Sequence, residues 1–143
     1  MRTRRPRERS SRGPGDGGVR SGTVADVTLD DLAVRLREFA AARAWEQFHT
    51  PKNLAMALAG EVGELVAELQ WLTPEETEQV MADPEAAARM RAELADVTIY
   101  LVRLADVLGV DLIEAARVKL VESDRRYDVD TYHGSARKAP PLS

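Results

Sequence analysis

Apolar residues recur every three or four positions in four stretches of the chain, and short polar segments separate these stretches. This spacing places the apolar side chains along one face of a helix. We therefore expect helices at about residues 28–45, 52–71, 84–108 and 112–127. Alanine, leucine, arginine and glutamate are abundant and β-branched residues seldom follow one another, so the composition favours helices over a β-sheet. The pattern predicts an all-α fold that resembles a four-helix bundle.

Signals at the helix ends support these boundaries. Thr28 and Asp31 resemble a capping box, in which each side chain binds the backbone N–H of the other residue. Gly109 suits the left-handed position that ends a helix, and Asp111 can cap the helix that follows. The segment 73–76, Thr-Pro-Glu-Glu, favours a helix start, but only one or two polar turns follow it.

Chain length and composition narrow the class of protein. A chain of 143 residues suits a single domain with one hydrophobic core. Cysteine is absent, which excludes disulfides, thiol nucleophiles and thiolate metal sites. The apolar runs are far shorter than the roughly 18 residues that a membrane-spanning helix needs, and no secretion signal is evident. We expect a cytoplasmic protein with no membrane partner.

The two ends of the chain differ in composition from its centre. Residues 1–26 are rich in Arg, Ser, Gly and Pro and nearly free of apolar side chains, which predicts a disordered Arg-rich tail. A transit peptide and a nucleic-acid-binding arm are the alternatives for this segment. Residues 131–143 predict a flexible C-terminal tail. The folded domain should therefore comprise residues 27–130.

Charge is distributed unevenly between these parts. The first 25 residues hold seven arginines against two acidic residues, a formal charge of +5, and the chain total of −4 leaves −9 for the remainder. This acidic body argues against nucleic-acid binding by the folded part. If its substrate is an anion, bridging cations are required.

Two pairs of carboxylates lie on the predicted helices. Glu61 and Glu64 are three residues apart on the second helix, so they share one face. Glu93 and Asp96 have the same spacing on the third helix. If these helices pack antiparallel, the four carboxylates could meet, and they would repel one another unless a cation neutralised them. Their oxygen atoms suit Mg²⁺ or Mn²⁺; the alternative is two solvated helix faces, as most pairs at this spacing are.

Aromatic residues near these pairs are of the kind that stacks on nucleotide bases. Tyr100 lies four residues beyond Asp96 and so on the same face of its helix. Trp71 ends the second helix, and Trp45 and His49 bracket the loop that leads into it. Packing within the core is the alternative role for these side chains.

Seven short segments between residues 29 and 127 share a family pattern. They include the acidic motifs Glu-x-x-Glu and Glu-x-x-Asp and a Trp-Glu-Gln-Phe-His loop. The segments are 45–49, 51–53, 61–65, 70–71, 93–97, 99–101 and 126–127. Together they resemble the MazG-like all-α pyrophosphatases, and the resemblance is closest to the dCTP pyrophosphatase branch.

The resemblance implies a Mg²⁺-dependent nucleoside triphosphate diphosphatase that sanitises the nucleotide pool. It would convert dCTP or a modified dCTP to the monophosphate and pyrophosphate. The helical bundle would be completed by oligomerisation, usually as a homotetramer. Two residues depart from the branch: Ser123 stands where it usually has Asn near the phosphates, and Leu36 where close relatives carry a His on the substrate side. Both departures bear on substrate preference more than on the reaction.

The resemblance also implies roles for individual residues. One of the four carboxylates or a neighbouring residue would act as the general base that the chemistry requires, and Glu61 and Glu64 are the candidates that we favour. The Mg²⁺ ligands would be Glu61, Glu64, Glu93 and Asp96. The substrate-binding residues would be Trp45, Gln47, His49, Trp71 and Tyr100 around the nucleoside and Lys119 at the phosphates.

Two functions of other classes stay open. A non-catalytic helical oligomerisation or regulatory module could use the acidic stripe only to bind a cation, and it would bind metal or nucleotide without releasing pyrophosphate. A nucleic-acid adaptor could use the Arg-rich tail. Its binding would fall steeply with salt and vanish when the tail is removed.

Overall fold

The computed structural model describes residues 27–141, and all regular elements within this range are helical. The four long helices are α1 (Leu29–Ala41), α2 (Pro51–Leu69), α4 (Pro84–Leu108) and α5 (Leu112–Arg126). The short elements are α3 (Pro74–Gln79), the 3-10 turn η1 (Val80–Ala82) and α6 (Val129–Tyr132). The predicted all-α class is confirmed. None of the described helices is both long and apolar enough to cross a bilayer. The Arg-rich tail predicted at 1–26 lies outside the described residues.

Side-chain caps and a left-handed glycine set helix ends where the sequence predicts them. Thr28 and Asp31 make both bonds of a capping box at the start of α1. The Asp111 carboxylate accepts the backbone N–H of Glu114 at 2.9 Å and caps α5. Gly109 has φ 67 and ends α4. These ends depend on neighbours in the sequence, which is why the sequence predicts them well.

Helix α1 ends at Ala41, before the position near Trp45 that the apolar pattern predicts. Ala44 is left-handed, with φ 52. The backbone N–H of Trp45 donates to the Ala40 carbonyl at 3.0 Å, a bond to the fifth residue back that is typical of a Schellman turn. The apolar pattern does not reveal this turn, because an alanine seldom takes the left-handed conformation.

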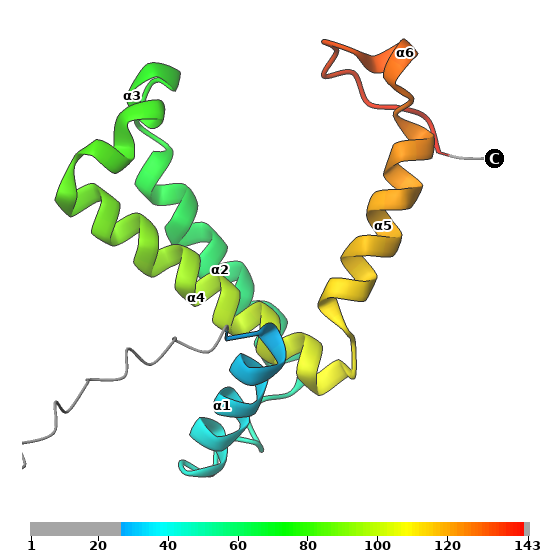
Figure 1. Ribbon diagram of the computed structural model, residues 1–143. Coiled ribbons are helices and arrows are strands. Elements are labelled where there is room, and N and C mark those ends of the chain that lie inside the picture. Colours follow the sequence, from blue (N-terminus) through cyan, green and yellow to red (C-terminus); the bar gives the residue numbers. More distant parts are fainter. Residues whose placement is uncertain (1–26, 142–143) are drawn as a thin grey trace, which may run out of the picture.

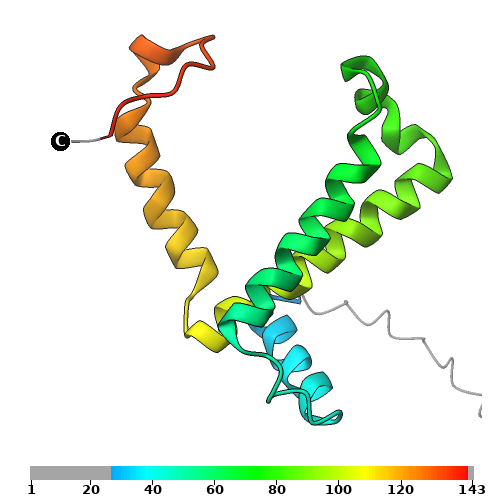
Figure 2. The same ribbon diagram turned by 180° about the vertical axis from the view of Figure 1, so that it is seen from behind.

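Helices α2 and α4 run antiparallel and side by side, and they form the largest interface between elements of the chain (Figures 1 and 2). Between them, α3 and η1 reverse the chain direction. Helix α1 packs on the C-terminal part of α4. The buried apolar side chains of these helices are Ala40, Leu54, Ala87, Met90, Val102 and Ala105. Most of them are small, so a single chain has a small core.

Helix α5 leaves the end of α4 and diverges from the α2–α4 pair in both views (Figures 1 and 2). None of its residues is buried. Large apolar side chains on α5 are consequently exposed, with Ile113 at 64% and Leu120 at 63% of their surface. One chain by itself therefore does not close a four-helix bundle.

The chain after α5 folds back onto the end of that helix. The Arg126 side chain donates from Nε to the Pro140 carbonyl at 2.9 Å and from Nη2 to the Ala139 carbonyl. Ala139 is buried, and the rings of Tyr127 and Tyr132 meet edge to face with centroids 5.2 Å apart. Arg126 therefore links the end of α5 to the segment for which the sequence predicts a flexible tail.

Candidate active site

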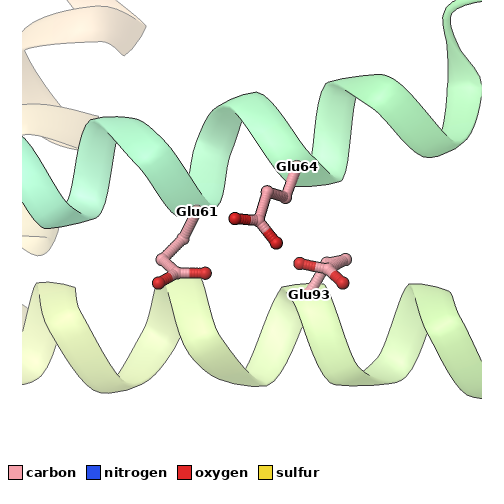
Figure 3. Close-up of side chains that lie close together, drawn as sticks. All are labelled: Glu61, Glu64 and Glu93. Atoms are coloured by element: carbon pink, nitrogen blue, oxygen red, sulfur yellow. The ribbon is translucent and has the colours of Figure 1, made fainter.

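Three carboxylates meet where α2 and α4 face each other. Glu61 and Glu64 project from successive turns of α2 toward Glu93 on α4 (Figure 3). One oxygen of each residue lies within 4.8 Å of an oxygen of the other two. The three-residue spacing on α2 and the antiparallel packing of the two helices together produce this arrangement, as the sequence pattern predicts.

Asp96, the fourth expected ligand, lies beside this group of three rather than inside it. Its charge reaches the group, since it contributes to raising the pKa of both Glu61 and Glu93. Asp96 also lines a neighbouring cavity together with Trp45 and Tyr100. It therefore connects the carboxylates with the aromatic residues.

The local environment disfavours negative charge at two of these carboxylates. Burial, followed by the charge of the nearby Glu64, raises the pKa of both Glu61 and Glu93. The Oε2 atom of Glu93 is fully enclosed and has no hydrogen-bond partner among the described residues. A buried polar atom in this condition destabilises the fold. A divalent cation would provide the missing partner and offset the repulsion.

A basic side chain joins α2 and α4 near these carboxylates, but it is paired with another acid. Arg89 of α4 donates from Nε to Glu68 Oε2 on α2 at 2.8 Å. Glu68 lies one turn beyond Glu64 and contributes to raising the pKa of Glu93. The ion pair thus joins the same two helices and leaves the three carboxylates without a basic partner of their own in the described chain.

Aromatic side chains surround a cavity next to Asp96. The cavity has a volume of about 630 Å³, which lies within the range typical of small-molecule sites. Its walls include Phe39 and Trp45, whose rings meet edge to face with centroids 5.8 Å apart. A smaller adjoining cavity, the inner recess, shares Tyr100 with it and is also lined by His49. Predicted base-binding residues therefore gather beside the carboxylates, and Phe39 is a further member that was not predicted from the sequence.

Three other expected substrate-binding residues lie apart from this cavity. Trp71 follows the end of α2 with 86% of its surface exposed. Gln47 donates from Nε2 to the Ala44 carbonyl of its own loop at 3.0 Å. Lys119 lies on the diverging helix α5 and pairs with Glu122 at 2.8 Å. Within one chain, these residues do not join the carboxylates or the aromatic cavity.

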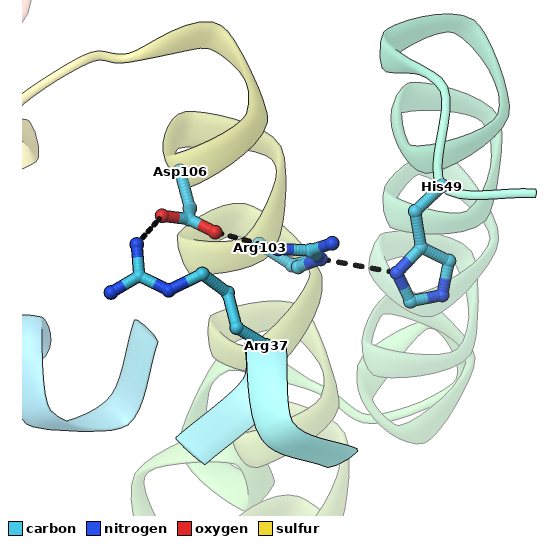
Figure 4. Close-up of polar contacts among 4 residues, drawn as sticks. All are labelled: Arg37, His49, Arg103 and Asp106. Carbon is cyan, nitrogen blue, oxygen red and sulfur yellow. Dashed lines mark hydrogen bonds and ion pairs between the residues drawn. The ribbon is translucent and has the colours of Figure 1, made fainter. Parts of the chain in front are cut away.

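A partly buried polar network borders the inner recess (Figure 4). Arg103 of α4 is only 7% exposed and donates from Nε to His49 Nδ1 at 3.1 Å. Its Nη1 binds Asp106 Oδ2 at 2.6 Å, and Arg37 of α1 binds the other oxygen of Asp106 at 2.7 Å. Arg103 was not among the site residues predicted from the sequence. Its spacing of three residues from Tyr100 places it on the same helix face and could have revealed it.

Known proteins match this chain over most of its length. The MazG-like family matches residues 57–142. The chain is 46% identical over 118 residues to dCTP pyrophosphatase 1 of Bos taurus, covering 82% of this chain and 70% of that protein. It is 46% identical over 117 residues to dCTP pyrophosphatase 1 of Homo sapiens, covering 82% of this chain and 69% of that protein. The crystal structure of a pyrophosphatase from Archaeoglobus fulgidus is similar with a TM-score of 0.65 and 38% identity, covering 70% of this chain and 92% of that chain.

Proposed function

Because the chain belongs to the MazG-like family, we propose that it is a Mg²⁺-dependent nucleoside triphosphate pyrophosphohydrolase acting on dCTP or a modified dCTP. The products would be the nucleoside monophosphate and pyrophosphate. The family that the sequence motifs predict is confirmed by the matches. Relatives named dCTP pyrophosphatase and a similar structure named pyrophosphatase support the enzyme class, and the former support cytosine as the base.

The observation that carries this proposal is the approach of Glu61, Glu64 and Glu93 within 4.8 Å of one another. Carboxylate oxygens suit Mg²⁺ and would also accept Mn²⁺. The enclosed Glu93 Oε2 fits this role, because it has no other partner in the described chain. Asp96 would serve as the fourth ligand. Bound Mg²⁺ would supply positive charge against the triphosphate and make a water molecule more acidic.

Side chains of this chain would also provide the general base and the groups that bind the nucleoside. Glu61 or Glu64 would accept the proton of the attacking water as general base. Trp45 and Tyr100 line the cavity beside Asp96 and would stack on the base. His49 in the inner recess would contact the edge of the base. The aromatic walls would also keep water away from the bound base.

The active unit that we propose is a homo-oligomer, and by resemblance a tetramer. Support comes from α5, where Ile113 and Leu120 are large apolar side chains exposed in a single chain. A second copy could cover them and close the helical bundle. Assembly would also be the means by which Trp71 and Lys119, which lie away from the cavity within one chain, reach a nucleotide.

A pyrophosphate-release assay tests the proposal. The purified protein is given each dNTP and NTP with Mg²⁺, and we expect pyrophosphate release with the highest kcat/KM for dCTP. Chelation of the metal should abolish release, and so should Glu64→Gln. Glu75→Gln is the matched control, because Glu75 is an exposed carboxylate on α3 outside the site. Binding of metal or nucleotide without pyrophosphate release would instead favour the non-catalytic module.

A further inference from the structure

Arg103 is a charged side chain in a buried position, and the pyrophosphatase reaction does not by itself require it. It is 7% exposed, and it lines the inner recess together with His49, Trp45 and Tyr100. Its Nε donates to His49 Nδ1, while its Nη1 donates to Asp106 (Figure 4). The guanidinium therefore contacts a residue of the expected base pocket directly.

The chemistry of the two groups fixes the direction of their hydrogen bond. A guanidinium carries only N–H donors and keeps its proton at all accessible pH values. His49 Nδ1 must therefore be the acceptor and carry no proton. In a neutral imidazole the single proton then lies on Nε2. Among the described residues, His49 Nε2 makes no hydrogen bond, so it remains available to a ligand.

We propose that Arg103 is a positioning residue that holds His49 in the Nε2–H tautomer, so that His49 presents a donor to the nucleotide base and favours cytosine over thymine or uracil. This inference rests on the function proposed above. Cytosine has an acceptor at ring position N3, whereas thymine and uracil carry a proton there. A donor facing N3 is satisfied by cytosine and opposed by the other two bases.

The surroundings of Arg103 keep this arrangement in place. Asp106 holds the guanidinium at 2.6 Å, and Arg37 from α1 holds Asp106 at 2.7 Å. Burial and then the positive charge of Arg103 lower the pKa of His49, and the opposing effect of Glu46 is smaller. A second proton on the ring is thus disfavoured. His49 stays neutral and keeps one tautomer near neutral pH.

The tautomer can be observed directly by ¹⁵N NMR of the full-length protein. The chain has only two histidines, and His133→Gln assigns their signals. We expect His49 to show an unprotonated Nδ1 and a protonated Nε2, and we expect the two nitrogen signals to move toward each other in Arg103→Met as both tautomers become populated. A protonated Nδ1 in the wild type, or unchanged signals in Arg103→Met, would overturn the proposal.

Kinetics then test the consequence for the base. We expect Arg103→Met to lower the ratio of kcat/KM for dCTP over dTTP by about tenfold, with a smaller change in kcat for dCTP. Arg103→Lys, which keeps a cationic donor, should recover part of the ratio. Arg91→Met is the matched control, because Arg91 is an exposed arginine on the same helix and makes no hydrogen bond to His49 or Asp106. Its ratio should equal that of the wild type.

A double-mutant cycle separates an effect through His49 from a general structural effect. In a His49→Ala background, Arg103→Met should leave the ratio of kcat/KM for dCTP over dTTP unchanged, because Arg103 would act on the base only through His49. A further fall in that background would overturn the proposal. Absence of turnover with every nucleotide in the wild type would refute the proposed function instead, and the NMR result would still decide the role of Arg103.

Discussion

Glu93 lies where its negative charge is unfavourable unless a cation is bound. Its pKa is raised above the ordinary value of 4.5, mainly by burial, so the folded protein binds this proton more tightly than the unfolded chain does. The resulting stabilisation is complete below the unfolded pKa and is lost as the pH rises through the folded pKa. At neutral pH, the ionised Glu93 therefore lowers the stability of the metal-free protein.

Glu93→Gln should consequently raise the melting temperature of the metal-free protein at pH 7 to 8. The gain should disappear below about pH 4.5, where both proteins carry a neutral group at this position. With Mg²⁺ the order should reverse, because only the wild type keeps the ligand. Thermal melts with EDTA and with Mg²⁺ measure both effects. Glu75→Gln is the control, and a lower melting temperature of Glu93→Gln in EDTA at pH 8 would contradict this account.

The exposure of Trp71 distinguishes a role in core packing from a role in stacking on the base. With 86% of its surface exposed, it contributes little packing within one chain. Trp71→Ala should therefore leave the melting temperature nearly unchanged. If Trp71 stacks on the base in the assembled enzyme, KM should rise by about one to two orders of magnitude, since such stacking contributes roughly 1–3 kcal/mol. Melts and dCTP kinetics are measured on one sample, and an unchanged KM would remove Trp71 from the base site.

At the scale of elements, the sequence predicts helix ends well, because interactions between residues close in the sequence determine them. Helix α4 begins at Pro84 and ends at Leu108, as the cap residues Asp83 and Gly109 indicate. Glu61 and Glu64 share one face of α2 because of their i,i+3 spacing, and the antiparallel packing turns that face toward Glu93 of α4. The Arg103 network was not predicted, since it joins α1, α4 and a loop whose positions depend on contacts distant in the sequence.

The end of α1 gives a prediction about stability. Ala44 is left-handed with φ 52, a conformation that costs a non-glycine residue roughly 1–2 kcal/mol. Ala44→Gly should therefore raise the free energy of unfolding by about 0.5–1 kcal/mol, after the greater entropy of the unfolded glycine is subtracted. Ala42→Gly is the control: with φ −59 it should lower the free energy of unfolding by about the same amount. Urea unfolding measures both, and equal signs would contradict this interpretation.

At the scale of the whole molecule, the sequence indicates which faces are apolar but not what covers them. The apolar periodicity of α5 correctly predicts a helix, and in a bundle Leu120 would be buried. In the single chain it stays exposed, because α5 diverges from the α2–α4 pair (Figure 2). The direction of a helix after a short connection depends on its packing partner, and that partner need not belong to the same chain.

Leu120→Glu should therefore act on assembly and not on the fold of the chain. Leu120 is 63% exposed, so the charge should leave helicity unchanged while it prevents apolar contact between copies. We expect a smaller species by light scattering and a loss of dCTP turnover, because Lys119 of α5 could no longer reach the phosphates. Leu120→Met is the matched control, since it keeps an apolar side chain of similar size at the same position. If Leu120→Glu keeps both the wild-type mass and turnover, α5 does not form the interface between copies, and Lys119 does not bind the nucleotide by way of assembly.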